Sequence, residues 1–213
     1  FHDGKPSSER RWNTVEPQGI EIRQTVFAYT AGQFQALKNI IYVRYRLKYT
    51  GFGIPNEPER IDSAYFGIWD DPDIGDSQDD LIGSDPVYAA EYSYNNGSDN
   101  IYGQNPPSFF ARIFAGPRTY IPGETFVDYN GNGEYDDGID ISIDTAYSMR
   151  GQLLGITRYP GAKNLNPSTN IAYINGVPDL LDPNTSGEAR NYMLGLTRLG
   201  DELDPCFWPY GEV

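Results

Sequence analysis

A two-residue alternation over residues 41–49 constrains the fold of this chain more than any other feature. Apolar or aromatic side chains occupy every odd position of this segment, and Tyr42 and three basic side chains occupy the even positions. Successive side chains of a β-strand point to opposite faces, so a period of two held this long predicts a strand with one buried face. Residues 20–28 show a similar period. The chain is therefore expected to be built from half-buried strands.

Shorter runs of the same kind predict more strands, and the composition agrees with them. The chain contains 17 Tyr, 23 Gly and 16 Pro. Aromatic residues favour strands, whereas Gly and Pro favour turns. The predicted fold class is all-β, an antiparallel β-sandwich with long Asp/Gly-rich loops and one C-terminal amphipathic helix. The further strands are expected at residues 63–69, 87–94, 108–114, 121–127, 139–144 and 151–157.

The helix is predicted over residues 186–199. Thr185 and Glu188 have the spacing of a capping box, in which each side chain bonds the other residue's backbone N–H. Gly200 stands where a glycine often ends a helix. Apolar side chains follow the cap at helical spacing, at Ala189, Tyr192, Met193, Leu196 and Leu199.

The predicted organisation is a single sandwich domain with an arm before it. Residues 1–18 are polar and contain two prolines, which predicts an extended arm. Residues 19–184 form the β-sandwich domain with its acidic loops, and residues 185–213 form a helix and tail that pack on it. No apolar run reaches the roughly 20 residues of a membrane-spanning helix, and no signal peptide is visible. The chain is expected to be a piece of a longer, processed protein.

The charge balance excludes some partners and favours cations. The chain has 30 acidic and 16 basic residues, for a net charge of -14. Proteins that bind nucleic acids or anionic membrane surfaces need basic patches. We therefore expect no nucleic acid and no membrane insertion, and the excess of carboxylates favours a metal cation.

The first acidic loop, Asp70–Asp85, predicts a calcium site. Six Asp residues fall within residues 70–80, where their charges would repel one another without a cation between them. Ca²⁺ prefers six to eight oxygen ligands on a flexible backbone, and Gly75 supplies a turn. The alternative is a solvated acidic loop without an ion. The candidate ligands are Asp71, Asp73, Asp76, Asp79 and Asp80.

The second acidic loop, Asp128–Gly138, follows the beginning of the calcium-loop pattern. Such loops have oxygen-bearing side chains at positions 1, 3 and 5, a glycine at position 6 and a carbonyl ligand at position 7. Position 12, where a bidentate acid is expected, is Ile139. The alternative is an Asn-Gly hairpin turn without an ion. The candidate ligands are Asp128, Asn130, Asn132 and Glu134, with Asp136, Asp137 or Asp140 completing the shell.

Catalytic chemistry has little support in the sequence. His2 is the only histidine, which disfavours a Ser-His-Asp triad and a histidine zinc site. Cys206 is the only cysteine, so no intrachain disulfide forms, and no histidine is near it in sequence. Paired carboxylates hydrolyse glycosides in some enzymes, but a chain this acidic always offers some pair. We therefore expect no enzymatic activity, with a carboxylate-based hydrolase as the weakest alternative.

Several stretches resemble a family of large secreted proteins from bacteria that use the type IX secretion system. The resemblance lies in residues 19–26, 39–45, 62–75 and 79–85, and the stretch from Trp69 to Asp85 is its most specific part. Members often have Cys at the position of Ser84. The resemblance implies export, a location outside the cell or on its outer surface, and a longer parent chain with a C-terminal sorting domain. It implies no reaction.

These features together predict a calcium-stabilised extracellular structural or interaction protein. Such a protein would be a subunit of a surface filament or layer, with protein partners or copies of itself, joined through a strand edge or the arm. The alternative is a carbohydrate-binding module of a larger exported protein. In that case Tyr and Trp side chains stack on a glycan.

Overall fold

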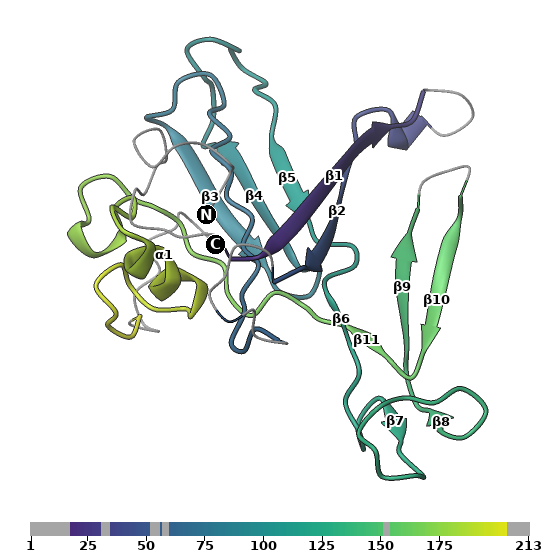
Figure 1. Ribbon diagram of the computed structural model, residues 1–213. Coiled ribbons are helices and arrows are strands. Elements are labelled where there is room, and N and C mark those ends of the chain that lie inside the picture. The colour runs from purple at the N-terminus through teal and green to yellow at the C-terminus, as the bar shows by residue number, and fades with distance from the viewer. Residues whose placement is uncertain (1–17, 31–34, 52–55, 57–59, 151–153, 204–213) are drawn as a thin grey trace. The chain divides into compact units, whose positions relative to one another are not determined.

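The computed structural model of the chain describes residues 18–30, 35–51, 56, 60–150 and 154–203 (Figure 1). The arm up to residue 17, His2 and Cys206 lie outside the described residues. The chain forms two compact units, one of residues 1–67 with 183–189 and the other of residues 68–182 with 190–213. Each unit is described by itself.

The first unit contains a ribbon of two antiparallel strands, β1 (Ile20–Ala28) and β2 (Ile41–Tyr49), which confirms both predicted strands. The predicted burial of their apolar side chains is wrong, since Val26 is 58% and Ile41 71% exposed. A short 3₁₀ helix, η2 (Gln35–Leu37), lies between them. The register places residue 20 opposite residue 49 and residue 28 opposite residue 41. One face of the ribbon is consequently apolar, and the other carries the basic side chains of both strands.

The predicted strand at 63–69 is wrong, since these residues pair with no strand in the described part of the chain. Ser63 has a φ of 54°, a left-handed conformation that interrupts an extended run at its first residue. The segment still contacts the ribbon. The Phe66 ring lies 5.3 Å from the Tyr45 ring on β2, in an edge-to-face arrangement.

The largest sheet of the second unit has the order β3 (Asp80–Asp85), β4 (Ala90–Asn95) and β5 (Phe109–Arg112). Both pairings are antiparallel. β3 lies inside the stretch that we expected to be an acidic loop, so that loop ends at residue 79. The strand predicted at 87–94 starts only at Ala90, because Asp85 Oδ1 accepts the N–H groups of residues 87 and 88 and closes a turn there.

The other strands of this unit are short and form three separate pairs. β6 (Arg118–Thr119) pairs with β11 (Lys163–Asn164), and β7 (Phe126–Val127) pairs with β8 (Ile141–Ser142). β9 (Thr145–Met149) pairs with β10 (Ile156–Pro160). The strands predicted at 121–127 and 139–144 are thus shorter than expected. The strand predicted at 151–157 falls partly outside the described residues.

The predicted helix is confirmed at its start and is shorter than expected at its end. α1 spans Ser186–Met193, after a 3₁₀ helix, η3 (Pro178–Leu180). Thr185 Oγ1 accepts the N–H of Glu188 at 3.2 Å, and the Glu188 carboxylate accepts the N–H of residue 184. Gly195, with φ 81°, ends the helix through bonds from residues 195 and 196 to the carbonyls of residues 192 and 191. Gly200 is therefore not the terminating glycine.

The all-β class is confirmed, because antiparallel sheets make up most of the regular structure and α1 is the one α-helix among the described residues. The sandwich arrangement and the domain limits stay predictions. The apolar core of the second unit has two centres. One is Leu180 and Tyr192 with the neighbouring residues 171–174, and the other is Phe126, which is 0% exposed.

Candidate cation sites

The loop after β7, residues 128–140, closes around the carboxylate of Asp136. The side-chain amides of Asn130 and Asn132 both donate to Asp136 Oδ2, at 2.7 and 2.8 Å. The Oδ1 atoms of the same two residues accept the N–H groups two positions further on. Of the three acids considered for completing the ligand shell, Asp136 is thus the one that lies against the amide side chains.

Asp128 and Asp140 hold the backbone of this loop. The Asp128 carboxylate accepts the N–H groups of Gly131 and Gly133, at 2.7 and 2.8 Å. Gly133 has φ 81°, which side chains disfavour, so position 6 of the loop requires glycine. Asp140 is buried and accepts the N–H of Asp136 at 2.8 Å and the N–H that follows Asp128 at 2.9 Å.

Tyr135 fixes the loop to the core. Its ring packs edge-to-face on Phe126 at 5.5 Å and stacks on Tyr120 at 6.0 Å. Burial raises the pKa of the Tyr135 phenol, and the nearby carboxylates of Asp137 and Asp140 raise it further. The phenol therefore stays neutral, and an aromatic anchor holds one side of an otherwise exposed acidic loop.

Asp99 organises the first acidic loop, although the sequence pattern did not single it out. This residue is 3% exposed and accepts the N–H groups of Asp76 and Ile101, each at 2.8 Å, and of Tyr102. Burial alone would raise the pKa of Asp99, but the backbone hydrogen bonds, led by that of Asp76, outweigh it and lower the pKa. Gly75, with φ 77°, lies so close that a Cβ there would collide with the Asp99 carboxylate.

Three side chains meet where β3 begins and β4 ends. Asp80 and Asn95 are directly opposite each other in the β3–β4 pairing, and Asn95 Nδ2 donates to Asp79 Oδ1 at 2.6 Å. Asp80 Oδ2 accepts the N–H of Ile74 at 2.9 Å. The second carboxylate oxygen of Asp80, Oδ1, and the amide oxygen of Asn95, Oδ1, are buried and have no hydrogen-bond partner. A buried acceptor without a donor costs about 1–3 kcal/mol, so these atoms need an explanation.

The predicted ligands of the first loop divide into two groups. Asp76, Asp79 and Asp80 are half-buried and hydrogen-bonded, with Asp76 Oδ2 accepting from the Asn100 amide at 2.9 Å. Asp71 and Asp73 are exposed and make no side-chain hydrogen bond with the described residues. Asp99, Asn95 and Asn100 lie 15 or more residues further along the chain than Asp80, so only the strand pairing brings them to this loop.

The second loop retains most of its predicted ligands in one place. Asp128, Asn130, Asn132 and Asp136 lie within one hydrogen-bonded turn, whereas Asp137 is exposed and makes no side-chain hydrogen bond with the described residues. Glu134 donates its N–H to Asn132 at 2.8 Å. In the described ranges no three carboxylate, histidine or cysteine side chains are grouped closely enough to hold a metal by themselves. Any cation would therefore depend on amide and backbone oxygens as well.

A further pair of carboxyl groups consists of Glu91, the second residue of β4, and Asp70, the first residue of the first acidic loop. Burial raises the pKa of Glu91 to about 7. The hydrogen bond that protonated Glu91 donates to the Asp70 carboxylate and the negative charge of Asp70 contribute to the rise. Glu91 thus holds a proton at a pH where most carboxyl groups are ionised.

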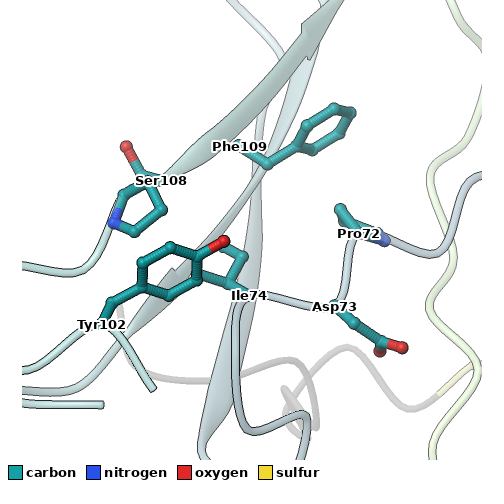
Figure 2. Close-up of a pocket in the computed structure, with 7 residues that line it drawn as sticks. Pro72, Asp73, Ile74, Tyr102, Ser108 and Phe109 are labelled. Atoms are coloured by element: carbon teal, nitrogen blue, oxygen red, sulfur yellow. The ribbon is translucent and has the colours of Figure 1, made fainter. Parts of the chain in front are cut away.

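A shallow hollow of about 320 Å³ lies beside the first acidic loop (Figure 2). Figure 2 shows the rings of Tyr102 and Phe109 on either side of it, with Ile74 between them and the Asp73 carboxylate pointing away. Its remaining lining consists of Pro72, Pro107 and Ser108. The hollow is therefore mainly apolar and aromatic.

No family model matches this chain, and neither the curated proteins nor the solved structures contain a match to it. No helix of the described residues is both long and apolar enough to cross a bilayer. The chemistry of the sites is therefore the basis for any functional proposal.

Proposed function

We propose that the chain is a calcium-stabilised extracellular structural or interaction protein, a subunit of a surface filament or layer. The observation that supports it best is the closure of loop 128–140 around Asp136. The loop has an oxygen-bearing side chain at positions 1, 3, 5 and 9 and a glycine with positive φ at position 6. A carbonyl oxygen has two lone pairs, so an Asn Oδ1 that accepts one N–H keeps a second for a cation.

The ligand chemistry favours Ca²⁺ and a location outside the cell. All candidate metal-ligand atoms in loop 128–140 are oxygens, and the backbone is irregular. This combination suits the variable coordination of Ca²⁺ better than the strict octahedron of Mg²⁺. Two of the side chains are neutral amides, and Ile139 occupies the position of the bidentate acid. A low count of charged ligands lowers affinity, and weak calcium sites suit the high calcium levels of extracellular modules.

Calcium is expected to raise the melting temperature of the purified chain. At a free calcium concentration one hundred times Kd, one bound ion adds about 2.7 kcal/mol of stability, which is roughly 5–10 °C for a chain of this size. Thermal unfolding in excess calcium and in chelator measures the shift. Asp128→Asn should remove the part of the shift that comes from the ion of loop 128–140, and Asp201→Asn, at an exposed carboxylate outside both acidic loops, should leave the shift unchanged. Equal melting temperatures with and without calcium in the unmodified chain would refute the proposal.

The interaction half of the proposal rests on an uneven charge distribution. The unit of residues 1–67 and 183–189 contains nine basic and eight acidic residues, a net charge of +1. The other unit contains seven basic and 22 acidic residues, a net charge of -15. On β2, Arg44, Arg46 and Lys48 share one face and form no ion pair among the described residues. A positive ribbon on one copy suits the acidic unit of the next, and such head-to-tail contacts repeat into filaments.

Reversal of the ribbon charges is expected to weaken self-association. Arg44→Glu with Arg46→Glu should lower the association constant by about tenfold or more, because like charges then face each other across the contact. The matched control is Lys38→Glu with Arg60→Glu, which changes the net charge equally in the same unit but away from the strands. Sedimentation velocity over a range of concentrations, in calcium, measures both. A chain that stays monomeric at all concentrations would contradict this half of the proposal.

A glycan ligand stays the alternative, and the hollow in Figure 2 is where it would bind. The rings of Tyr102 and Phe109 suit stacking on a sugar. The hollow has few polar groups to orient a sugar, because the Asp73 carboxylate points away from it. The structural role is therefore the better supported of the two.

A further inference from the structure

We propose that Asp79, Asp80 and Asn95 hold a calcium ion of their own at the start of β3, separate from the ion of loop 128–140. This inference rests on the proposed function and extends it, because it assigns two independent ions to the chain. It also names Asn95 as a ligand, and no sequence motif includes that residue.

The strand pairing brings the three side chains together. Directly opposed residues of an antiparallel pair project from the same face of the sheet, with Cβ atoms about 5 Å apart, and Asp80 and Asn95 are such a pair. Asp79 joins them through the 2.6 Å bond that its Oδ1 accepts from Asn95 Nδ2. The arrangement is therefore fixed by the β3–β4 ladder and not by a flexible loop alone.

The unpaired oxygens indicate what is missing from this place. Asn95 is only 8% exposed, and both its Oδ1 and Asp80 Oδ1 are buried without a donor. Two backbone donors of the first acidic loop are already used, since the N–H of Ile74 bonds Asp80 Oδ2 and the N–H of Asp76 bonds Asp99. A cation that contacts both Asp80 Oδ1 and Asn95 Oδ1 would supply each of these oxygens with a partner.

The charge of the group supports a divalent cation. Asp79 and Asp80 are adjacent carboxylates, and neither forms an ion pair with a basic side chain in the described part of the chain. Buried or half-buried carboxylates without a counter-charge are unfavourable unless they are paired or bind a metal. Side-chain oxygens from two carboxylates and an amide, completed by water, match the preferences of Ca²⁺.

The two ion sites are independent in structure. The first belongs to the β3–β4–β5 sheet and the second to the loop between β7 and β8, and they share no residue. Since no side chain belongs to both clusters, each site should fill and empty without the other.

Isothermal titration of the full chain with CaCl₂ tests this inference through the number of ions bound. The unmodified chain is expected to bind two ions. Asp80→Asn and Asp128→Asn should each bind one, the double variant none, and the control Asp201→Asn, at an exposed carboxylate outside both acidic loops, two. Circular dichroism establishes that each variant is folded.

Asn95→Asp provides a second readout that does not depend on loss of binding. A carboxylate in place of the amide should tighten the first site by about tenfold, and in chelator it should lower the melting temperature because Asp79 then faces a like charge. Unchanged affinity at both sites would overturn the inference.

The outcomes separate the two proposals. One ion in the unmodified chain, lost in Asp128→Asn and kept in Asp80→Asn, would overturn the separate site and leave the proposed function standing. No binding in the unmodified chain would overturn both. Two ions that are lost together in either single variant would refute independence and replace it with one shared cluster.

Discussion

Replacement of Phe126 by alanine is expected to destabilise the second unit by about 3–5 kcal/mol, the range for removing a fully buried aromatic ring. Phe126 is 0% exposed and packs edge-to-face on Tyr135. A cavity at this point removes both the transfer energy of the ring and the support of the loop anchor. Urea unfolding followed by circular dichroism measures the loss, and the melting temperature should fall by roughly 8–15 °C.

The neighbouring residue provides a matched control for this prediction. Val127 is on the same strand but is 37% exposed, so Val127→Ala should cost less than about 1 kcal/mol. Phe126→Ala should also weaken calcium binding at loop 128–140, because Tyr135 would lose its support. A similar small loss for both variants would mean that Phe126 is not the centre of a core.

The stability of the chain is expected to fall as the pH rises from about 5 to about 7. Burial and the Asp70 carboxyl raise the pKa of Glu91 to about 7, whereas an unfolded Glu has a pKa near 4.3. Between these values the native state holds a proton that the unfolded state has released, so raising the pH favours unfolding. Full linkage at about 1.36 kcal/mol per pKa unit would give roughly 3–4 kcal/mol, and partial solvation reduces this to about 1–2 kcal/mol.

Glu91→Gln isolates this effect. The amide keeps the size of the side chain and cannot lose a proton, so the variant should show a nearly flat stability between pH 5 and 7. Unfolding is best measured in chelator, because calcium binding also depends on pH. A slope of stability against pH that persists in Glu91→Gln would show that other groups cause it.

Asp99 affects stability in a more acidic pH range. Its lowered pKa contributes stability above about pH 3.9, and this contribution is lost as the pH falls through the pKa of Asp99 in the folded state.

Local patterning predicted the elements whose residues carry their own signal. The alternation over 41–49 specified β2 to the residue, and the Thr185–Glu188 pair specified the start of α1. The end of α1 was mistaken because Leu196 and Leu199 continue the apolar spacing, while the Gly195 turn stops the backbone. Spacing reports which face a side chain would occupy, but not whether the backbone hydrogen bonds continue.

Elements defined by distant partners were not predictable in this way. β3 begins and ends with Asp, a residue depleted in strands, and it exists because β4 pairs with all six of its residues. The same pairing brings Asn95 to Asp79 and Asp80. The candidate ligands of loop 128–140 could be predicted because they are close in sequence. The group of Asp79, Asp80 and Asn95 could not, because it depends on contacts between residues about 15 positions apart.

The β1–β2 ribbon has one consequence for the behaviour of the chain in solution. Neither strand pairs with a third strand among the described residues, so each presents an open row of backbone donors and acceptors. Strands of other molecules can pair with such edges, which leads to aggregation, and charged side chains on the strands oppose this pairing. Arg44, Arg46 and Lys48 are therefore expected to reduce the formation of insoluble β-aggregates. Neutral replacements at these positions are expected to cause precipitation, which is why glutamate, and not alanine, is the informative substitution there.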